Sequence, residues 1–147
     1  MSADRQFVDT NVLVYAHDVT AGVKHQMARA LVEELWQSRQ GCLSIQVLQE
    51  FFVISTRKIP QPLEVSVAAQ VVHDLAHWHV HAPVASDVRA AIDIHALAGV
   101  SFWDSMILRS AKELGCQIVH SEDLNPGQDY NGVQVRNPFG QARDEKP

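Results

Sequence analysis

The sequence predicts an α/β fold in which a mostly parallel sheet carries helices on both faces. Short apolar segments that suit buried strands alternate along the chain with longer segments whose apolar residues recur at helical spacing. Strands that alternate with helices are typical of parallel sheets. The length of 147 residues suits one domain with its own core. We therefore expect a single domain over residues 1–140 and a disordered tail at 141–147.

The first expected strand, Gln6–Asp9, leads directly into a short helix over Asn11–Ala16. The strand is otherwise apolar but ends in an acid. In parallel sheets, ligand sites lie at the carboxyl ends of the strands. Thr10 or Asn11 could cap the helix equally well, so capping alone does not require Asp9. Asp9 is therefore the first candidate site residue.

The next segments predict a helix over Val23–Ser38, a second buried strand over Cys42–Ile45 and a helix over Gln46–Lys58. In this last helix Glu50 lies at the border of the apolar stripe. Two prolines end the helix, and the following one is expected over Pro62–Ala76.

The second half of the chain continues the alternation. The sequence predicts a strand over His77–His81, a helix that begins at Val84 or Ala85 and ends at Ala98, the clearest helix at Ser101–Leu114, and strands at Gln117–His120 and Val133–Val135. The helix from position 101 has the start of a capping box and ends before a glycine.

Two further acids follow these elements. Asp104 lies in the first turn of its helix, and Asp123 follows a strand by three residues, so Asp123 and Asp9 are expected at the same edge of the sheet. Each acid alone has an ordinary structural explanation. The helix dipole favours an acid at position 104, a turn favours one at position 123, and Glu50 could lie at the solvated edge of its helix. Clustered carboxylates, however, repel one another and lose hydration unless cations neutralise them.

Oxygen ligands without cysteine or histidine suit Mg²⁺ or Mn²⁺. Such an ion polarises a phosphoryl oxygen and lowers the pKa of a bound water, which favours phosphodiester hydrolysis. The formal net charge of −5 argues weakly against a broad nucleic-acid-binding surface. It does not exclude a nucleic-acid enzyme, because carboxylates that bind metal ions add to the negative count.

The two cysteines, Cys42 and Cys116, form no paired motif and are expected as small buried residues in a reducing cytoplasm. The N-terminal residues lack the pattern of a signal peptide. Every apolar run is much shorter than the roughly 18 residues of a membrane span. We therefore expect a cytoplasmic protein that does not contact a membrane.

Four segments, taken in order, carry a resemblance to a known family. They are Phe7–Leu13 (FVDTNVL), Gln49–Phe51 (QEF), Ser101–Ile107 (SFWDSMI) and Ser121–Leu124 (SEDL). Together they resemble the PIN-domain nucleases, and most closely the VapC-type toxins of bacterial toxin–antitoxin pairs. The resemblance extends over nearly the whole chain, to Val135–Phe139.

The resemblance implies a three-layer α/β/α sandwich around a mostly parallel sheet of four or five strands, and Mg²⁺- or Mn²⁺-dependent cleavage of RNA. It places the catalytic, metal-binding acids at Asp9, Glu50, Asp104 and Asp123, and supporting polar residues at Thr10 or Asn11 and at Ser121.

Roles follow from the chemistry of the acids. Asp9 and Asp104 are expected to bind the main ion, and Asp123 the same ion or a second one. Glu50 would orient the attacking water or help to hold the second ion. Asn11 and Ser121 would fix the geometry of the carboxylates.

The resemblance also implies a homodimer that is inhibited by an antitoxin whose C-terminal segment occupies the acidic groove. An exposed apolar face over Val65–Leu75 could supply the dimer contact. Arg57 and Lys58 could contact substrate phosphates, although pairing with the helix C-terminus is the favoured interpretation. Single-stranded RNA, a tRNA stem-loop and ribosomal RNA all stay open as targets.

Histidines invite a different metal interpretation. If their apolar neighbours face inward, His77, His79 and His81 share the solvent face of a strand, near His73. That arrangement could bind Zn²⁺ or Ni²⁺ adventitiously. Structural zinc sites show tighter Cys/His signatures, so a solvated strand face is expected.

The sequence also offers two other functional interpretations. Asp9-Thr10-Asn11 superficially resembles the aspartate loop of haloacid-dehalogenase phosphatases, but that mechanism needs a second acid where Asn11 stands. The remaining alternative is a catalytically silent PIN domain that acts as an RNA- or protein-binding module. The complete set of acids argues against it.

Overall fold

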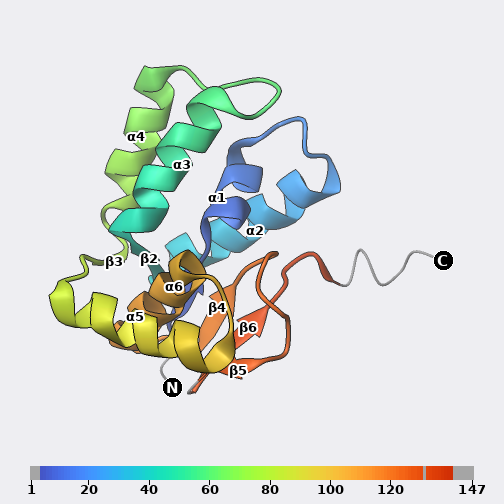
Figure 1. Cartoon of the computed structure of the whole chain (residues 1–147). Helices are drawn as coiled ribbons and strands as arrows, with labels where there is room; N and C mark the ends of the chain where they lie inside the picture. The colour runs from blue at the N-terminus through green and yellow to red at the C-terminus, as the bar shows by residue number, and fades with distance from the viewer. Residues whose placement is uncertain (1–3, 131, 141–147) are drawn as a thin grey trace.

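The structure, a computed structural model, describes residues 4–130 and 132–140. In this part of the chain, one sheet is flanked by helices (Figure 1). The strands are β1 (Gln6–Val8), β2 (Gly41–Ser44), β3 (His79–His81), β4 (Ile118–His120), β5 (Asp129–Tyr130) and β6 (Val133–Arg136). The helices are α1 (Thr10–His17), α2 (Val23–Ser38), α3 (Ile45–Arg57), α4 (Val65–Leu75), α5 (Ala85–Ala98) and α6 (Phe102–Glu113). The tail expected at 141–147 lies outside the described residues.

The sheet has the order β3-β2-β1-β4-β6-β5. All neighbouring strands pair in parallel except β5 and β6, which are antiparallel. The expectation of a mostly parallel sheet is confirmed. The expected number of four or five strands is too low, because six form within the described residues. The strand that the sequence did not reveal is β5, whose two residues are too few to show an alternating pattern.

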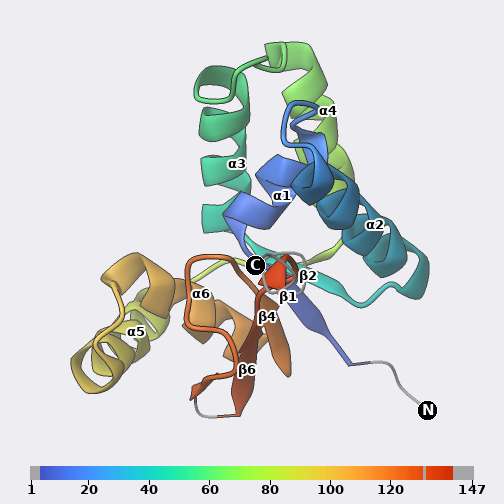
Figure 2. The same cartoon turned by 90° about the vertical axis from the view of Figure 1, so that its right-hand side faces the viewer.

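Helices cover both faces of the sheet. Figure 2 shows the strands between α2 on one side and the α5–α6 pair on the other. Helix α6 contacts β2, β4 and β6, whereas α2 contacts β2 from the other face. Helix α1 packs on α2 and α3, and α3 pairs with α4. The predicted arrangement of helices on both faces is thus confirmed, with β1 and β4 at the centre.

Some boundaries differ from the expected ones. β3 begins at His79, two residues later than expected, because the backbone N–H groups of His77 and Trp78 donate to the carbonyls of Asp74 and Leu75 at the end of α4. The Trp78 ring packs against Gly41 of β2. A Cβ atom at Gly41 would lie 2.5 Å from the Trp78 ring, so only glycine allows this contact.

Helix α4 begins at Val65 rather than Pro62, because Glu64 has an extended backbone (φ −66°, ψ 150°). β2 ends at Ser44 and α3 begins at Ile45, one residue before the expected boundary, because Ser44 caps the helix.

The ends of α5 and α6 lie within one residue of the expected ones. Ser101 precedes α6, and its hydroxyl accepts a hydrogen bond from the backbone N–H of Asp104 at 3.1 Å. Helix α5 ends at Ala98, and Gly99 follows in the left-handed conformation. Among the described residues, no single helix is long and apolar enough to cross a membrane.

Candidate active site

The carboxyl ends of β1 and β4 lie side by side at one edge of the sheet. Val8, the last residue of β1, is in register with His120, the last of β4. The backbone N–H of Asp9 donates to the carbonyl of His120 at 2.9 Å. The segments that follow the two strands therefore start at one place, which brings Asp9 close to the segment 121–123.

Asp9 is the N-cap of α1, with a side chain that is only 6% exposed. One oxygen accepts a hydrogen bond from the backbone N–H of Thr10 at 2.7 Å, and the other accepts from Ser121 Oγ at 2.8 Å. The interpretation that Thr10 or Asn11 caps the helix is therefore wrong: the helix begins one residue earlier than expected, and the acid itself caps it. Burial raises the pKa of Asp9 to about 6, and the nearby charges of Asp104 and Asp123 act in the same direction.

Glu50 is held from two sides. The hydroxyl of Thr10 donates to Glu50 Oε1 at 2.6 Å, and Gln46 Nε2 donates to Oε2 at 3.3 Å. Of the two polar residues expected to support the acids here, Thr10 therefore makes the contact. Asn11 donates to none of them: its amide nitrogen and oxygen are buried without a hydrogen-bond partner in the structure.

Asp104 and Asp123 complete the set. Asp104 lies in the first turn of α6 and is half-buried, whereas Asp123 is exposed. Burial raises the pKa of Asp104, and the charges of Asp123 and Glu50 raise it further. Ser121 Oγ accepts hydrogen bonds from the backbone N–H of Asp123 at 3.2 Å and of Leu124 at 3.3 Å. Ser121 thus links Asp9 to the backbone of the loop after β4.

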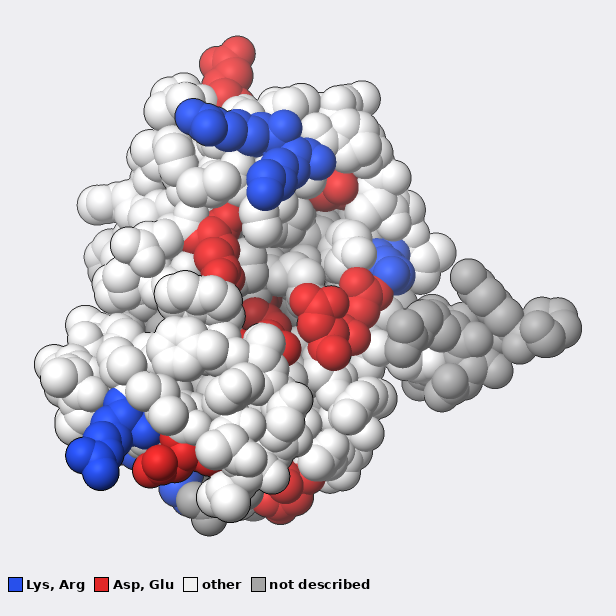
Figure 3. All heavy atoms as spheres, viewed as in Figure 1, with Lys and Arg blue, Asp and Glu red and all other residues white. Residues whose placement is uncertain are grey.

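All four acids line one cavity of about 440 Å³. Figure 3 shows acidic side chains gathered around the hollow in the middle of this face, with Lys and Arg side chains above it. The residues that line it include Asp9, Thr10, Asn11, Gln46, Glu50, Ile54, Lys58, Trp103, Asp104 and Asp123. Within residues 4–130 and 132–140, none of the four acids forms an ion pair. The described part of the protein therefore supplies no cationic side chain that neutralises these four carboxylates.

Two further acids that lie near this cavity are not singled out by the sequence. Glu122 forms an ion pair with Lys24 and accepts a hydrogen bond from the hydroxyl of Tyr15 at 2.9 Å. Asp18 lines the cavity, but its Oδ1 accepts from the hydroxyl of Thr20 at 2.6 Å. The partners of Glu122 are 98 and 107 positions away in the chain, so no local pattern could reveal them.

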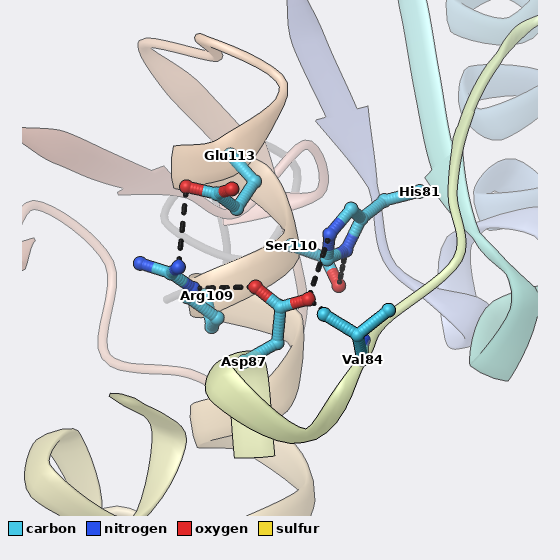
Figure 4. A network of polar contacts seen from close by, with 6 residues as sticks. All are labelled: His81, Val84, Asp87, Arg109, Ser110 and Glu113. Carbon is cyan, nitrogen blue, oxygen red and sulfur yellow. Dashed lines mark hydrogen bonds and ion pairs between the residues drawn. The ribbon is translucent and has the colours of Figure 1, made fainter. Parts of the chain in front are cut away.

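A second cluster lies between β3, α5 and α6 (Figure 4). Ligand atoms of His81, Asp87 and Glu113 lie within 4.8 Å of one another, which is closer than any three of the four cavity acids within the described residues. Arg109, however, already binds Asp87 at 2.9 Å and Glu113 at 3.3 Å. Its guanidinium supplies the positive charge that a metal ion would bring, so we do not assign a metal site here.

The solvated strand face expected for His77, His79 and His81 is not observed, because His81 is largely buried. Its side chain is only 13% exposed, with Nδ1 2.8 Å from Ser110 Oγ and Nε2 3.3 Å from Asp87. His79 Nε2 lies 3.2 Å from the carbonyl of Arg39, and His77 Nδ1 3.2 Å from that of Asp74. The three histidines of this segment therefore contact different partners and do not share one open face.

Comparisons with known proteins agree with this geometry. The PIN domain family matches residues 7–126. No curated protein matches the sequence. Three similar solved structures are the sarcin-ricin loop cleaving toxin VapC20 of Mycobacterium tuberculosis, a toxin–antitoxin complex from Klebsiella pneumoniae and DNA-bound VapBC from Salmonella typhimurium.

The three alignments extend over most of both chains. VapC20 is 21% identical, covers 80% of this chain and 89% of its own, and has a TM-score of 0.62. The Klebsiella structure is 15% identical, covers 91% and 98%, and has a TM-score of 0.67. The Salmonella structure is 17% identical, covers 92% and 99%, and has a TM-score of 0.64. At these identities the likeness establishes the fold.

Proposed function

The chain belongs to the PIN-domain family, and from this premise we propose that it is a Mg²⁺- or Mn²⁺-dependent ribonuclease that hydrolyses RNA phosphodiester bonds. The observation that carries this proposal is the cavity lined by Asp9, Glu50, Asp104 and Asp123, none of which has a cationic partner among the described residues. Carboxylates cost free energy when they are brought together and partly dehydrated. A function that requires a bound cation accounts for that cost.

The contrast between Glu122 and its neighbour supports a cation site. Glu122 is neutralised by Lys24, whereas Asp123, the next residue, lines the cavity without an ion pair. Carboxylate oxygens are the ligands that Mg²⁺ and Mn²⁺ prefer. The residues present therefore fit a hard divalent ion, which Asp9, Asp104 and Asp123 would hold. Bound there, such an ion polarises a phosphoryl oxygen and lowers the pKa of a water molecule.

The remaining polar residues of the cavity support these acids. Thr10 holds one oxygen of Glu50 at 2.6 Å, and we assign to Glu50 the orientation of the attacking water. Ser121 holds one oxygen of Asp9 at 2.8 Å, which leaves that carboxylate in one orientation. The buried amide of Asn11 has no hydrogen-bond partner among the described residues, and we assign to it a water molecule at the cavity wall.

The biological role that we propose is that of a cytoplasmic toxin in a toxin–antitoxin pair. Two of the similar structures are a toxin–antitoxin complex and DNA-bound VapBC, and the third is a toxin. An antitoxin that inhibits this protein would need to neutralise the acidic cavity, and a basic side chain inserted into it would do so. We also propose that the protein acts as a homodimer.

Cleavage of RNA tests this function. Purified protein, free of any antitoxin, is incubated with a mixed RNA pool in Mg²⁺, in Mn²⁺ and in EDTA, together with Asp104→Asn. We expect metal-dependent cleavage that is reduced by at least about 100-fold in the variant, because a carboxylate that binds the ion is lost.

The matched control is Glu122→Gln, which removes an acid beside the cavity that is already paired with Lys24. This variant should keep most of the activity. If folded wild-type protein leaves the pool and total tRNA intact in every metal, the alternative function as a silent binding module replaces the nuclease.

A further inference from the structure

The cavity is a groove that extends along α3. Four of its lining residues, Gln46, Glu50, Ile54 and Lys58, are spaced by four positions and lie on one face of this helix and its C-cap. At 1.5 Å per residue, the stripe from Gln46 to Lys58 is roughly 18 Å long. Glu50 belongs to this stripe, and the other three acids line the same cavity, so chemically different groups can flank the acids at the two ends.

Trp103 lies at the end of the groove near Gln46. Its side chain is 62% exposed, compared with 39% for Trp36 and 8% for Trp78. Its ring meets the ring of Phe102 edge-on, with centroids 5.1 Å apart, and its carbonyl accepts from Gln46 Nε2 at 3.4 Å. An aromatic surface next to Asp104 is thus left largely uncovered by the described part of the chain.

Lys58 lies at the opposite end of the stripe, where it is the C-cap of α3. It lines the same groove and forms no ion pair with a described residue. The neighbouring Arg57 is also exposed but does not line the groove. The groove therefore has an aromatic group at one end, acids in the middle and a cation at the other end.

This inference rests on the proposed ribonuclease function. We propose that a single strand of RNA lies along the groove, with an unpaired base stacked on Trp103 and a phosphate beside Lys58. Bases of single strands stack on exposed aromatic side chains, and lysine binds phosphate as a compact charge. A base inside a duplex is already stacked and paired, so it cannot use Trp103. Unpaired nucleotides next to the scissile bond are thus the preferred substrate.

The first experiment measures kcat/KM on an RNA that the wild-type protein cleaves. Trp103→Ala should lower kcat/KM by about 5- to 100-fold, because the stacking of one base is lost. Trp103→Phe should stay within about threefold of wild type, since it keeps an aromatic face. A second RNA lacks the base next to the scissile bond. Wild type should cleave this RNA much more slowly than the intact RNA, whereas Trp103→Ala should cleave both RNAs at the same rate.

Trp36→Ala is the matched control, because Trp36 is also exposed but does not line this groove. It should leave kcat/KM unchanged. If Trp103→Ala cleaves RNA like wild type, the stacking role is excluded, and Trp103 is then a contact for a protein partner if the variant also loses binding to an antitoxin.

Lys58 is tested by salt dependence. In Lys58→Ala, the slope of log kcat/KM against log salt should become less steep by about one, as expected for one lost phosphate contact. Arg57→Ala should keep the wild-type slope. Equal slopes in Lys58→Ala and wild type would remove Lys58 from the proposed path of the strand.

A binding measurement separates this inference from the nuclease proposal. In EDTA, oligouridylate should quench part of the tryptophan fluorescence of wild type and of Trp36→Phe but not of Trp103→Phe. The same oligonucleotide annealed to oligoadenylate should quench far less. Such quenching in EDTA, combined with a failure of the same protein to cleave RNA in Mg²⁺ or Mn²⁺, would uphold the stacking role and overturn the nuclease. Cleavage in Mg²⁺ or Mn²⁺, combined with equal quenching of wild type and Trp103→Phe in EDTA, would uphold the nuclease and overturn the stacking role.

Discussion

The carboxylate of Asp9 is buried at the end of β1, where two hydrogen-bond donors contact it and no cation of the described residues does. Burial outweighs the two hydrogen bonds, so the pKa rises from 3.8 to about 6. An acid whose pKa is higher in the folded than in the unfolded state destabilises the fold at every pH at which it is ionised. The destabilisation is absent below pH 3.8, grows as the pH rises through the window from 3.8 to 6, and is complete above it.

Asp9→Asn should therefore stabilise the metal-free protein at neutral pH. The amide keeps an oxygen for the N–H of Thr10 and removes the buried charge, so we expect a gain of about 1–3 kcal/mol in the free energy of unfolding at pH 7.5. The gain should shrink as the pH falls toward 4.

Urea unfolding of both proteins in EDTA, across this pH range, measures the difference. A variant that is less stable than wild type at every pH would show that Asp9 serves the fold alone.

At the scale of single elements, Asp87 links three of them. It lies in the first turn of α5, accepts the backbone N–H of Val84 at 2.8 Å, and binds Arg109 of α6 and His81 of β3 (Figure 4). The N–H of Val84, and then the Arg109 side chain and the charge of His81, lower the pKa of Asp87 despite its burial. Its ionised form thus stabilises the fold above pH 3.8, and this contribution is lost as the pH falls below that value.

Asp87→Asn should lower the free energy of unfolding by about 2–4 kcal/mol at pH 7, because it leaves Arg109 without its buried partner. The control Glu113→Gln breaks an exposed pair of the same arginine and should change the free energy of unfolding by less than about 0.5 kcal/mol. Denaturant unfolding measures both. Equal stability of Asp87→Asn and wild type would mean that this cluster does not hold β3 against α5 and α6.

An element can be predicted from the sequence when the interactions that fix its ends involve residues close together in the chain. Helix α6 was predicted from Ser101 and Gly115, because caps and stops act within a few residues. The role of Asp9 as N-cap was missed, since three adjacent polar residues can all cap a helix. The burial of His81 could not be predicted, because its partners Asp87 and Ser110 come from other elements.

At the scale of the whole molecule, the parallel sheet explains why the acids meet. Because β1 and β4 are adjacent and parallel, the residues after both strands lie at one edge, as expected for Asp9 and Asp123. The neutralisation of Glu122 by Lys24 could not be foreseen, since it depends on how α2 packs beside the loop after β4. Which acids bind a cation is therefore decided by tertiary contacts that residue type does not reveal.

The four acids of the groove are proposed to form one cation site, and binding of Mn²⁺, followed by electron paramagnetic resonance, can be measured on the purified protein without any RNA. Wild type is compared with Asp104→Asn, Asp123→Asn, Glu122→Gln and Glu113→Gln. We expect saturable binding that is weakened by about 10-fold or more in the first two variants and unchanged in the last two. Binding that is lost in Glu113→Gln but kept in Asp104→Asn and Asp123→Asn would place the ion at the His81–Asp87–Glu113 cluster, and the four acids of the groove would then not form the cation site.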